Sequence, residues 1–273
     1  MSNIEKSHIT AALSFELDHC DEPIVYERMI SRLTDISLEL AQAVALQVGG
    51  PMPEKAGRPN HGQTSKGLSQ MDLTPDALGF PATIASRQIG MIIGEGFNLK
   101  EYEAVKGALT AAGAFVFTIG PKKQNVIPKE GGKGVMPDHH FEGQRSTMYD
   151  ALYIPSGSHV AILKKQGRVI HWIREAFGHC KTIGATGEAV ELVKIACGVE
   201  GMKFAESQDD GTVDCYGVVT ASLGGGSGEK ERIVEAPKII KGGKRMLDVF
   251  VYNVSQHRCW LRELDGLTTM VAY

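Results

Sequence analysis

Hydrophobic positions divide the chain into three stretches with different patterns. From residue 4 to residue 48, apolar side chains recur every three or four positions, the spacing of helices with one buried face. Residues 49–86 hold five prolines, several glycines and few regularly spaced apolar positions. After residue 86, short continuous apolar runs alternate with amphipathic segments. The pattern predicts a helical leader at 1–48, a linker at 49–86 and a main domain at 87–273.

Two helices are expected in the leader. Pro23 opens the second, because proline is tolerated in the first turn of a helix. The helical spacing then continues to Val48, so one unbroken helix is predicted as far as Gly49-Gly50-Pro51. Unstructured loops as long as 49–86 are uncommon inside a compact domain, and this stretch therefore marks a boundary.

The main domain is predicted to alternate buried strands with helices. Continuous apolar runs at 89–93, 114–119, 149–154 and 181–185 are typical of strands that are buried on both faces. Helices are expected at 98–113, 158–165, 168–178, from 187 onward, and at 244–260, the last one a core helix. Short β pieces are expected within 122–142, and 205–228 is expected to be irregular. The fold class is therefore α/β, a doubly wound and mainly parallel sheet with helices on both faces.

Charge and cysteine spacing narrow the function classes. A net charge of −3 argues against a general nucleic-acid binder, since such domains usually carry a basic excess. No apolar run approaches the ~18–20 residues that span a bilayer, so no membrane partner is expected. The N-terminus lacks a signal-peptide pattern, although a signal on a longer parent chain leaves localisation open. Five widely spaced cysteines favour buried thiols over a disulfide framework.

Three predicted turns follow strands at the edge where open α/β sheets bind ligands: residues 94–97, 155–158 and 184–188. In this order they resemble the DJ-1/PfpI branch of the class I glutamine amidotransferase-like superfamily, which implies a flavodoxin-like fold. The resemblance places the family's acidic residue at Glu101 and its nucleophilic cysteine at Ala185. The acid is retained and the thiol is absent, and a methyl group cannot act as a nucleophile.

The elbow of Ala185, Thr186 and Gly187 is therefore predicted to be a vestigial site with Glu101 as its retained acid. Thr186 is interpreted as a helix N-cap, because a neutral threonine needs a base within hydrogen-bond reach to react. None of the histidines His159, His171 and His179 has a spacing that specifies such a pairing. Glu101 itself is explained by the preference of first-turn carboxylates for the helix dipole. No catalytic, cofactor-binding or metal-binding residue is predicted.

A second resemblance covers nearly the whole chain. Several uncommon strings, in the right order, are similar to large-subunit haem catalases: Ile4-Glu-Lys-Ser-His-Ile9 with Phe15-Glu-Leu17, Phe141-Glu-Gly-Gln-Arg-Ser-Thr147, His171-Trp172 with Glu175-Ala-Phe-Gly-His179, and Ile183-Gly-Ala-Thr-Gly-Glu-Ala189. The resemblance implies the C-terminal part of such a catalase, with the end of its helical region, a linker and an appended domain. It also implies a tetrameric parent that holds the haem, the catalase core as a partner, and no cofactor in this chain.

Haem chemistry is not expected in these residues. Arg145 precedes Tyr149 by four positions, as in a haem-ligand motif, but the family has phenylalanine where this chain has Thr147. Tyr149 is also expected to begin a core strand, and no distal-histidine motif is present. Asp138-His139-His140 is interpreted as surface, Lys122-Lys123 as a solvated edge, and 224–228 as a flexible loop without P-loop spacing.

Three functions remain open at this stage. The leading one is an accessory module that stabilises the catalase tetramer and acts as a holdase-type chaperone for unfolded client proteins. The second is a hydrolase or glyoxalase-like enzyme that uses Glu101 with Thr186 or a nearby histidine. The third is a small-ligand or peroxide-channelling module, in a crevice formed by Gly94–Gly96, Gly157 and Ala185.

Overall fold

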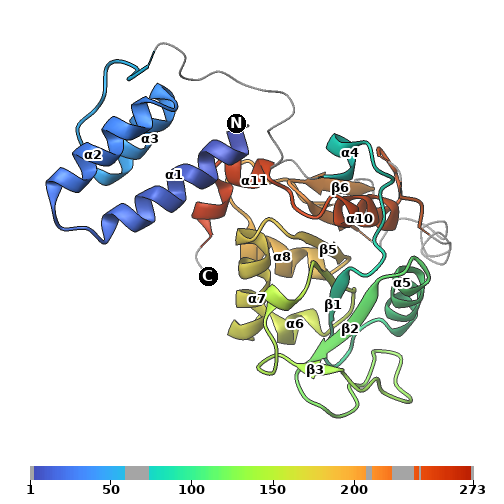
Figure 1. Ribbon diagram of the computed structural model, residues 1–273. Helices are drawn as coiled ribbons and strands as arrows, with labels where there is room; N and C mark the ends of the chain where they lie inside the picture. Colours follow the sequence, from blue (N-terminus) through green and yellow to red (C-terminus); the bar gives the residue numbers. More distant parts are fainter. Residues whose placement is uncertain (1–2, 59–73, 207–210, 223–236, 240, 272–273) are drawn as a thin grey trace. The chain divides into compact units, whose positions relative to one another are not determined.

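The structure is a computed structural model in two compact units, with the boundary between Leu73 and Thr74. It describes residues 3–58, 74–206, 211–222, 237–239 and 241–271 (Figure 1). Each unit has a hydrophobic core of its own. Among the described residues, no helix has the length and apolar character needed to cross a membrane.

The N-terminal unit is a bundle of three helices. These are α1 (Asn3–Asp18), α2 (Pro23–Thr34) and α3 (Leu38–Val48). Its core contains Leu17, Ile30, Leu33, Leu40 and Val44. Apolar residues at helical spacing fill this core, as predicted from the leader.

The single helix predicted from Pro23 to Val48 is wrong. The chain leaves the helix after Thr34, and Ser37 is extended with φ −158°. The Ser37 hydroxyl accepts a hydrogen bond from the backbone N–H of Leu40 at 3.4 Å and caps α3. Helical spacing alone missed the break because apolar residues continue across it at a compatible period.

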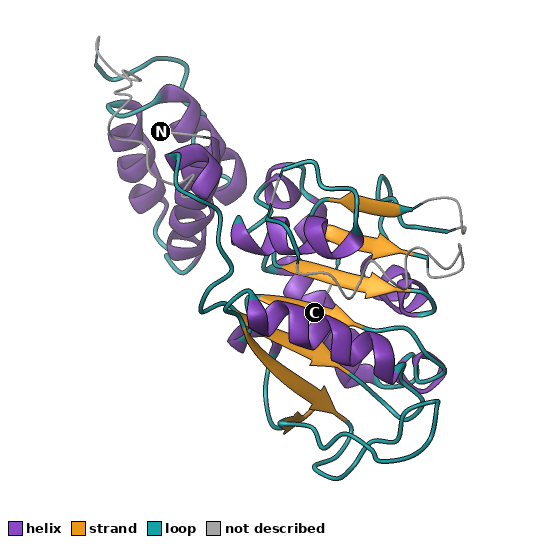
Figure 2. Cartoon of the chain, turned by 90° about the vertical axis from the view of Figure 1, so that its right-hand side faces the viewer, coloured by secondary structure: helices purple, strands orange, loops and turns teal. Residues whose placement is uncertain are grey.

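The C-terminal unit is built on one seven-stranded sheet. Its strands are β1 (Gln88–Ile92), β2 (Phe115–Gly120), β3 (His139–His140), β4 (Ala151–Ile154), β5 (Thr182–Thr186), β6 (Thr212–Cys215) and β7 (Val218–Ala221). The spatial order is β3-β2-β1-β4-β5-β7-β6, and every pairing is parallel except that of β6 with β7. The doubly wound, mainly parallel sheet is confirmed (Figure 2).

Helices cover both faces of this sheet. The helical elements are α4 (Pro75–Leu78), α5 (Leu99–Ala111), η1 (Ser146–Met148), α6 (Val160–Leu163), α7 (Gly167–Gly178), α8 (Ala189–Cys197), α10 (Met246–Ser255), α11 (Leu261–Leu264) and η2 (Leu267–Met270). On one face, α7 and α8 pack through Trp172, Ile173 and Leu192. On the other face, α5 and α10 pack through Val105 and Phe250.

Three boundaries differ from the sequence prediction. Residues 74–86 do not belong to the linker, because Asp76 accepts hydrogen bonds from Tyr252 at 2.5 Å and from Lys241 at 3.1 Å within the C-terminal unit. The last long helix, expected to reach residue 260, ends at Ser255. Tyr149 lies before β4 rather than at its start.

The stretch predicted to be irregular contains the hairpin of β6 and β7. Its turn is formed by Tyr216 and Gly217, which both have positive φ, at 53° and 74°. This is the geometry of a tight hairpin turn. Sequence inspection missed it because tyrosine replaces the usual asparagine or aspartate of such turns. The predicted loop at 224–228 lies outside the described residues.

The order of the strands defines where a ligand site is expected. The chain runs outward from β1 to β2 on one side and to β4 on the other, so the topological switch point lies between β1 and β4. The turns that follow β1, β4 and β5 therefore lie next to one another, as predicted.

Candidate functional site

Glu101 lies in the first turn of α5, where local capping fixes its position. The Asn98 side-chain oxygen accepts from the backbone N–H of Glu101 at 3.3 Å, which confirms Asn98 as the N-cap. The Glu101 side chain does not extend into solvent, since the residue is 5% exposed. Its carboxylate contacts the carboxyl ends of β4 and β5, so the helix dipole alone does not explain it.

Four donors surround the Glu101 carboxylate. Tyr153 donates its hydroxyl to Oε1 at 2.9 Å. Ser156 donates its backbone N–H and its hydroxyl to Oε2, at 3.0 and 2.5 Å. Thr186 donates its hydroxyl to Oε1. A carboxylate offers about four acceptor positions, so these bonds fill its capacity and join α5 to β4, β5 and the turn after β4.

Thr186, rather than Ala185, is the elbow residue that faces Glu101. Side chains alternate between the two faces of a strand. Ala185 belongs to the core under α7 and α8, whereas a Cβ on Gly184 would lie 2.8 Å from Phe250 on the opposite face. Gly187, with φ 54°, turns the chain out of β5. The position that resemblance assigned to the nucleophile thus points away from the retained acid.

The interpretation of Thr186 as a helix N-cap is wrong. Helix α8 begins at Ala189 with Glu188 in the capping position, and no side chain caps it. Glu188 instead accepts from the backbone N–H of Gly157 at 3.0 Å. Thr186 and Glu188 therefore both join the elbow to other elements of the domain.

His159 is a buried structural histidine that links two of the three turns. Its Nδ1 accepts from the Gly94 backbone N–H at 3.0 Å, so its Nε2 donates to the Pro155 carbonyl at 2.8 Å. Burial lowers the pKa of His159 to about 4. Since both ring nitrogens are engaged, His159 has none left to serve Thr186 as a base. His171 lies on α7 with its Nε2 3.9 Å from Glu175, and His179 follows that helix. Helix α7 packs on the face of the sheet opposite the one that Thr186 faces.

Burial dominates the electrostatics of the Glu101 cluster, by which we mean Glu101, Tyr153, Ser156 and Thr186. Desolvation raises the pKa of Glu101, and the four hydrogen bonds oppose that rise. Desolvation also raises the pKa of Tyr153 well above its usual range, and the neighbouring Glu101 charge adds to the increase. In chemical terms, Glu101 stands where a base would accept the Thr186 proton.

The cluster is closed to solvent. Tyr153, Ser156 and Thr186 are 1%, 2% and 1% exposed. At Gly157, a Cβ would lie 2.5 Å from the Gly96 carbonyl oxygen. The backbones of these two turns are thus in contact at Gly157, where part of the predicted crevice was placed.

The segment between β2 and β3 covers this edge of the sheet, which sequence inspection did not foresee. The Gly96 N–H donates to the Ile127 carbonyl at 2.8 Å, and the Lys129 N–H donates to the Phe97 carbonyl at 2.9 Å. Glu95 accepts from the Ile127 N–H at 2.6 Å. Backbone hydrogen bonds therefore hold this cover across the turn that precedes α5, the helix of the buried Glu101.

The haem-ligand spacing of Arg145 and Tyr149 does not correspond to a haem site. The Tyr149 ring packs between Phe117 and Trp172, with centroid distances of 5.8 and 5.6 Å. Burial, followed by the Asp138 charge, raises the pKa of Tyr149 to about 12. A haem-ligating tyrosine needs an open face for the macrocycle, whereas the Phe117 and Trp172 rings pack against Tyr149, so Tyr149 does not fit the role of a haem ligand.

Other predicted surface features have ordinary partners. Lys122 forms an ion pair with Glu95 at 2.7 Å, and Lys123 donates to the Asp138 carbonyl at 2.8 Å. His139 and His140 form β3. In the part of the chain that is described, no three His, Cys, Asp or Glu side chains gather as a metal site.

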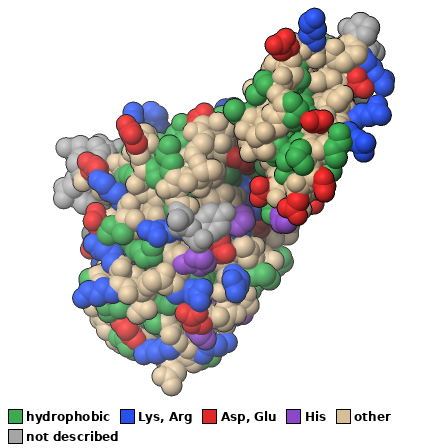
Figure 3. All heavy atoms as spheres, turned by 90° about the vertical axis from the view of Figure 1, so that its left-hand side faces the viewer, with side chains coloured by type: hydrophobic (Ala, Val, Ile, Leu, Met, Phe, Trp, Pro, Cys, Tyr) green, Lys and Arg blue, Asp and Glu red, His purple; other side chains and the backbone are tan. Residues whose placement is uncertain are grey.

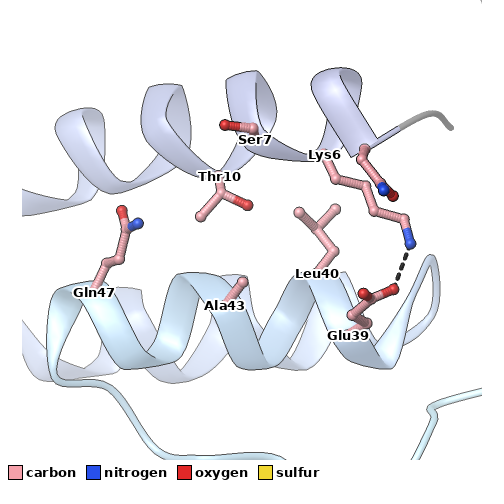
Figure 4. Close-up of a pocket in the computed structure, with 8 residues that line it drawn as sticks. Lys6, Ser7, Thr10, Glu39, Leu40, Ala43 and Gln47 are labelled. Atoms are coloured by element: carbon pink, nitrogen blue, oxygen red, sulfur yellow. Dashed lines mark hydrogen bonds and ion pairs between the residues drawn. The ribbon is translucent and has the colours of Figure 1, made fainter. Parts of the chain in front are cut away.

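A pocket of about 310 Å³ lies in the N-terminal unit, between α1 and α3 (Figure 4). An ion pair between Lys6 and Glu39 closes one end. Thr10, Leu40 and Ala43 lie along its length. The lining combines this ion pair with Leu40, Ala43 and the polar side chains of Asn3, Ser7, Thr10 and Gln47.

The fold is that of a flavodoxin-like α/β domain, and its elbow holds Ala185 and Thr186 with no thiol. Comparison with known families identifies it further. Residues 85–222 match the family described as "C-terminal domain found in long catalases", and residues 1–48 match "Catalase-related immune-responsive". The chain belongs to the family of C-terminal domains found in long catalases.

Curated relatives extend the similarity over the whole chain. Catalase A of Emericella nidulans is 48% identical over 100% of this chain and 37% of its own length. Catalase-1 of Neurospora crassa is 46% identical, covering 100% and 36%, and Catalase HPII of Mycobacterium avium is 28% identical, covering 98% and 35%. The chain thus spans about a third of the length of these relatives.

Among solved structures, a two-domain protein from Anabaena variabilis, with DJ-1/ThiJ/PfpI-like and ferritin-like domains, is similar at a TM-score of 0.47. It is 15% identical, and the match covers 50% of this chain and 44% of the other.

Proposed function

We propose that this chain is the accessory C-terminal part of a large catalase that decomposes hydrogen peroxide. It carries no catalysis of its own, stabilises the catalase tetramer and acts as a holdase-type chaperone. The observation that supports this most strongly is the Glu101 cluster, in which the retained acid is sealed and bonded to Thr186 with no thiol beside it. The haem of the parent enzyme lies outside these residues, since Tyr149 does not fit it.

The geometry disfavours the enzyme alternative. A hydrolase or glyoxalase needs a reacting carbon about 3 Å from its nucleophile. Thr186 is 1% exposed, and its hydroxyl is directed at Glu101. A substrate would first have to displace the cover held at Gly96 and Phe97. We therefore interpret the Glu101 cluster as a structural hydrogen-bond network that joins α5 to β4, β5 and the turn after β4.

Exposed apolar side chains support the assembly role. In the helical unit, Phe15 is 65% and Leu46 is 75% exposed. Figure 3 shows hydrophobic side chains on the surfaces of both units. Large apolar side chains at a surface favour a partner, and the catalase core of the parent chain is the partner we propose.

The chaperone role has a matching surface in the C-terminal unit. Leu261, Leu264 and Met270 are 62%, 40% and 57% exposed, on α11 and η2, which contact each other. Their neighbour Leu267 is buried and anchors the segment. Such a patch binds the apolar segments that unfolding clients expose.

The test is suppression of aggregation. A heat-labile client is warmed with this chain at a near-stoichiometric ratio, and light scattering is recorded. We expect strong suppression, retained by Glu101→Gln and reduced when Leu261, Leu264 and Met270 are all changed to serine. Unchanged scattering with the wild-type chain would remove the chaperone role.

The tetramer role needs a separate measurement. The parent catalase is compared with a shortened version that ends just before the position of Thr74 of this chain. The two forms are compared by sedimentation and by their thermal midpoints. We expect the shortened form to dissociate at lower temperature. Equal stability of the two forms would remove this part of the proposal and leave the chaperone role to its own test.

A further inference from the structure

Two cysteines meet at the amino-terminal edge of the sheet, opposite the Glu101 cluster. Cys180 follows α7, and Cys259 precedes α11. The backbone N–H of Cys259 donates to the Cys180 carbonyl at 2.8 Å. With standard bond lengths, this bond limits their Cα separation to about 6.7 Å, within the roughly 4.4–6.8 Å that disulfides span. This separation of the two Cα atoms permits a bridge.

Cys180 occupies a backbone position that usually belongs to glycine. Its φ is 55°, in the left-handed region. The Lys181 N–H reaches back to the Ala176 carbonyl at 2.9 Å, which closes the end of α7 in the arrangement that favours glycine at this position. A cysteine occupies this position despite the conformational cost.

A buried guanidinium lies beside this pair. Arg262 is fully buried and stacks on the Phe177 ring, 4.2 Å from its centroid. Its Nη1 donates to the Phe177 carbonyl at 2.8 Å and to the Lys181 carbonyl at 3.2 Å. In the part of the chain described, Arg262 donates its hydrogen bonds to backbone carbonyls. Its charge acts on the Asp214 carboxylate and on the thiols of Cys180 and Cys259.

The ionisation of the two thiols reflects this neighbourhood. Burial raises the pKa of Cys180 to about 11, Arg262 opposes the rise, and Cys259 adds to it. Burial likewise raises the pKa of Cys259, again opposed by Arg262. Each thiol is therefore mostly protonated at neutral pH, and any reaction of its thiolate accelerates as pH rises.

We propose that Cys180 and Cys259 form a redox pair that a hydroperoxide oxidises to an intrachain disulfide. Cys259 is the attacking thiol, because it is partly exposed whereas Cys180 is 2% exposed. The Cys259 thiolate attacks one peroxide oxygen, the O–O bond breaks, and the hydroxide that leaves takes up a proton, giving a sulfenic acid and water. The Cys180 thiolate then attacks the Cys259 sulfur, the S–O bond breaks, and a second water leaves. In sum, two thiols and one hydrogen peroxide give one disulfide and two waters.

The bridge would fasten the segment that contains α11 to the end of α7. Arg262 would aid the first step by stabilising the Cys259 thiolate. Cys197 provides a contrast, because it is 1% exposed and its thiol donates to the Val193 carbonyl within α8. Cys215 is the competing partner, since it is partly exposed and lies near the same edge.

Mass spectrometry of the peroxide-treated chain tests this proposal without relying on any variant. The 273-residue chain is exposed to hydrogen peroxide, free thiols are alkylated, and the protein is digested with trypsin. Cleavage after arginine and lysine releases Cys180 in peptide 175–181 and Cys259 in peptide 259–262. We expect these peptides to appear joined, lighter by two hydrogen atoms than their sum, to separate on reduction, and to join several-fold faster at pH 8.5 than at pH 7.

Variants sharpen the result. Cys180→Ser should abolish the joined peptide and leave Cys259 as a higher oxide, whereas Cys197→Ser should leave it unchanged. The proposal is overturned if both thiols are still alkylated after peroxide treatment. It is equally overturned if Cys259 pairs with Cys215 instead. Because added peroxide is the oxidant, either outcome leaves the proposed role in a catalase untouched.

Discussion

Replacing Glu101 by alanine and by glutamine tests whether its carboxylate has a structural role, as a hydrogen-bond acceptor, or a catalytic role, as an acid or base. The carboxylate accepts from Tyr153 and Thr186 at Oε1 and twice from Ser156 at Oε2. Alanine removes all four acceptor positions at once. Glutamine keeps one oxygen, which can remain opposite the fixed backbone N–H of Ser156, and turns its amide N–H groups toward the hydroxyls of Tyr153 and Thr186.

The expected magnitudes follow from those contacts. The Ser156 N–H cannot reorient, and a buried donor without a partner costs about 1–3 kcal/mol. The space left by the missing side-chain atoms adds to this, so Glu101→Ala should lower the free energy of unfolding by about 3–5 kcal/mol. In Glu101→Gln the two hydroxyls rotate to accept, so the cost should stay below about 1 kcal/mol.

Urea unfolding of the purified chain measures both values, with fluorescence of Trp172, which is buried in the same unit. Glu103→Ala is the matched control, because Glu103 lies on the same helix and is exposed, and it should change stability by less than about 0.5 kcal/mol. An alanine variant as stable as wild type, or a glutamine variant as damaged as the alanine one, would refute the structural interpretation.

The stability of the wild-type chain and of Glu101→Gln should depend differently on pH. The pKa of Glu101 is raised by burial, so the folded state binds its proton at higher pH than the unfolded state. Stability from this group is therefore present below the unfolded pKa of about 4.5 and decreases as pH rises through the folded pKa. Glu101→Gln should lack this decrease.

Three further predictions concern buried residues elsewhere in the C-terminal unit. The pKa of His159 is lowered to about 4, so on acidification this histidine is protonated in the unfolded chain before it is protonated in the folded one. The free energy of unfolding should therefore fall by up to ~3 kcal/mol as pH drops from 6.5 to 4. An equally steep fall with pH in His159→Gln would contradict this. In Gly184→Ala the new methyl would lie 2.8 Å from Phe250, so urea unfolding should show a loss of about 1–3 kcal/mol, and no loss would mean that the packing is looser than described. Arg262→Met removes the guanidinium that donates to the carbonyls of Lys181 and Tyr216 and should lower the thermal midpoint. An unchanged midpoint would show that water replaces the guanidinium.

The architecture could be predicted from the sequence because parallel strands buried on both faces appear as short continuous apolar runs. Continuous apolar runs fixed β1, β2 and β5 to within two residues, and Asn98 correctly opened α5. Motif resemblance also singled out Glu101, although neither its burial nor its hydrogen-bond partners were predicted. These features depend on local sequence alone, which is why they could be predicted.

The remaining features depend on tertiary context. Whether Ala185 or Thr186 faces Glu101 depends on the register of β5, and a shift of one residue exchanges the two faces. Alignment on Gly187 cannot decide that register. The cover at Ile127 depends on backbone bonds to a distant turn, which carry no sequence trace. The hairpin at Tyr216 and Gly217 was missed because its turn has an uncommon residue.

The central claim is that these residues bind no haem and do not catalyse the decomposition of hydrogen peroxide to oxygen. The most direct test is the absorption spectrum of the purified chain after incubation with haem and removal of the excess, combined with oxygen evolution on addition of hydrogen peroxide. We predict no Soret band from bound haem and no oxygen above the buffer blank. A stable Soret band together with oxygen evolution, both lost in Tyr149→Phe, would contradict the account.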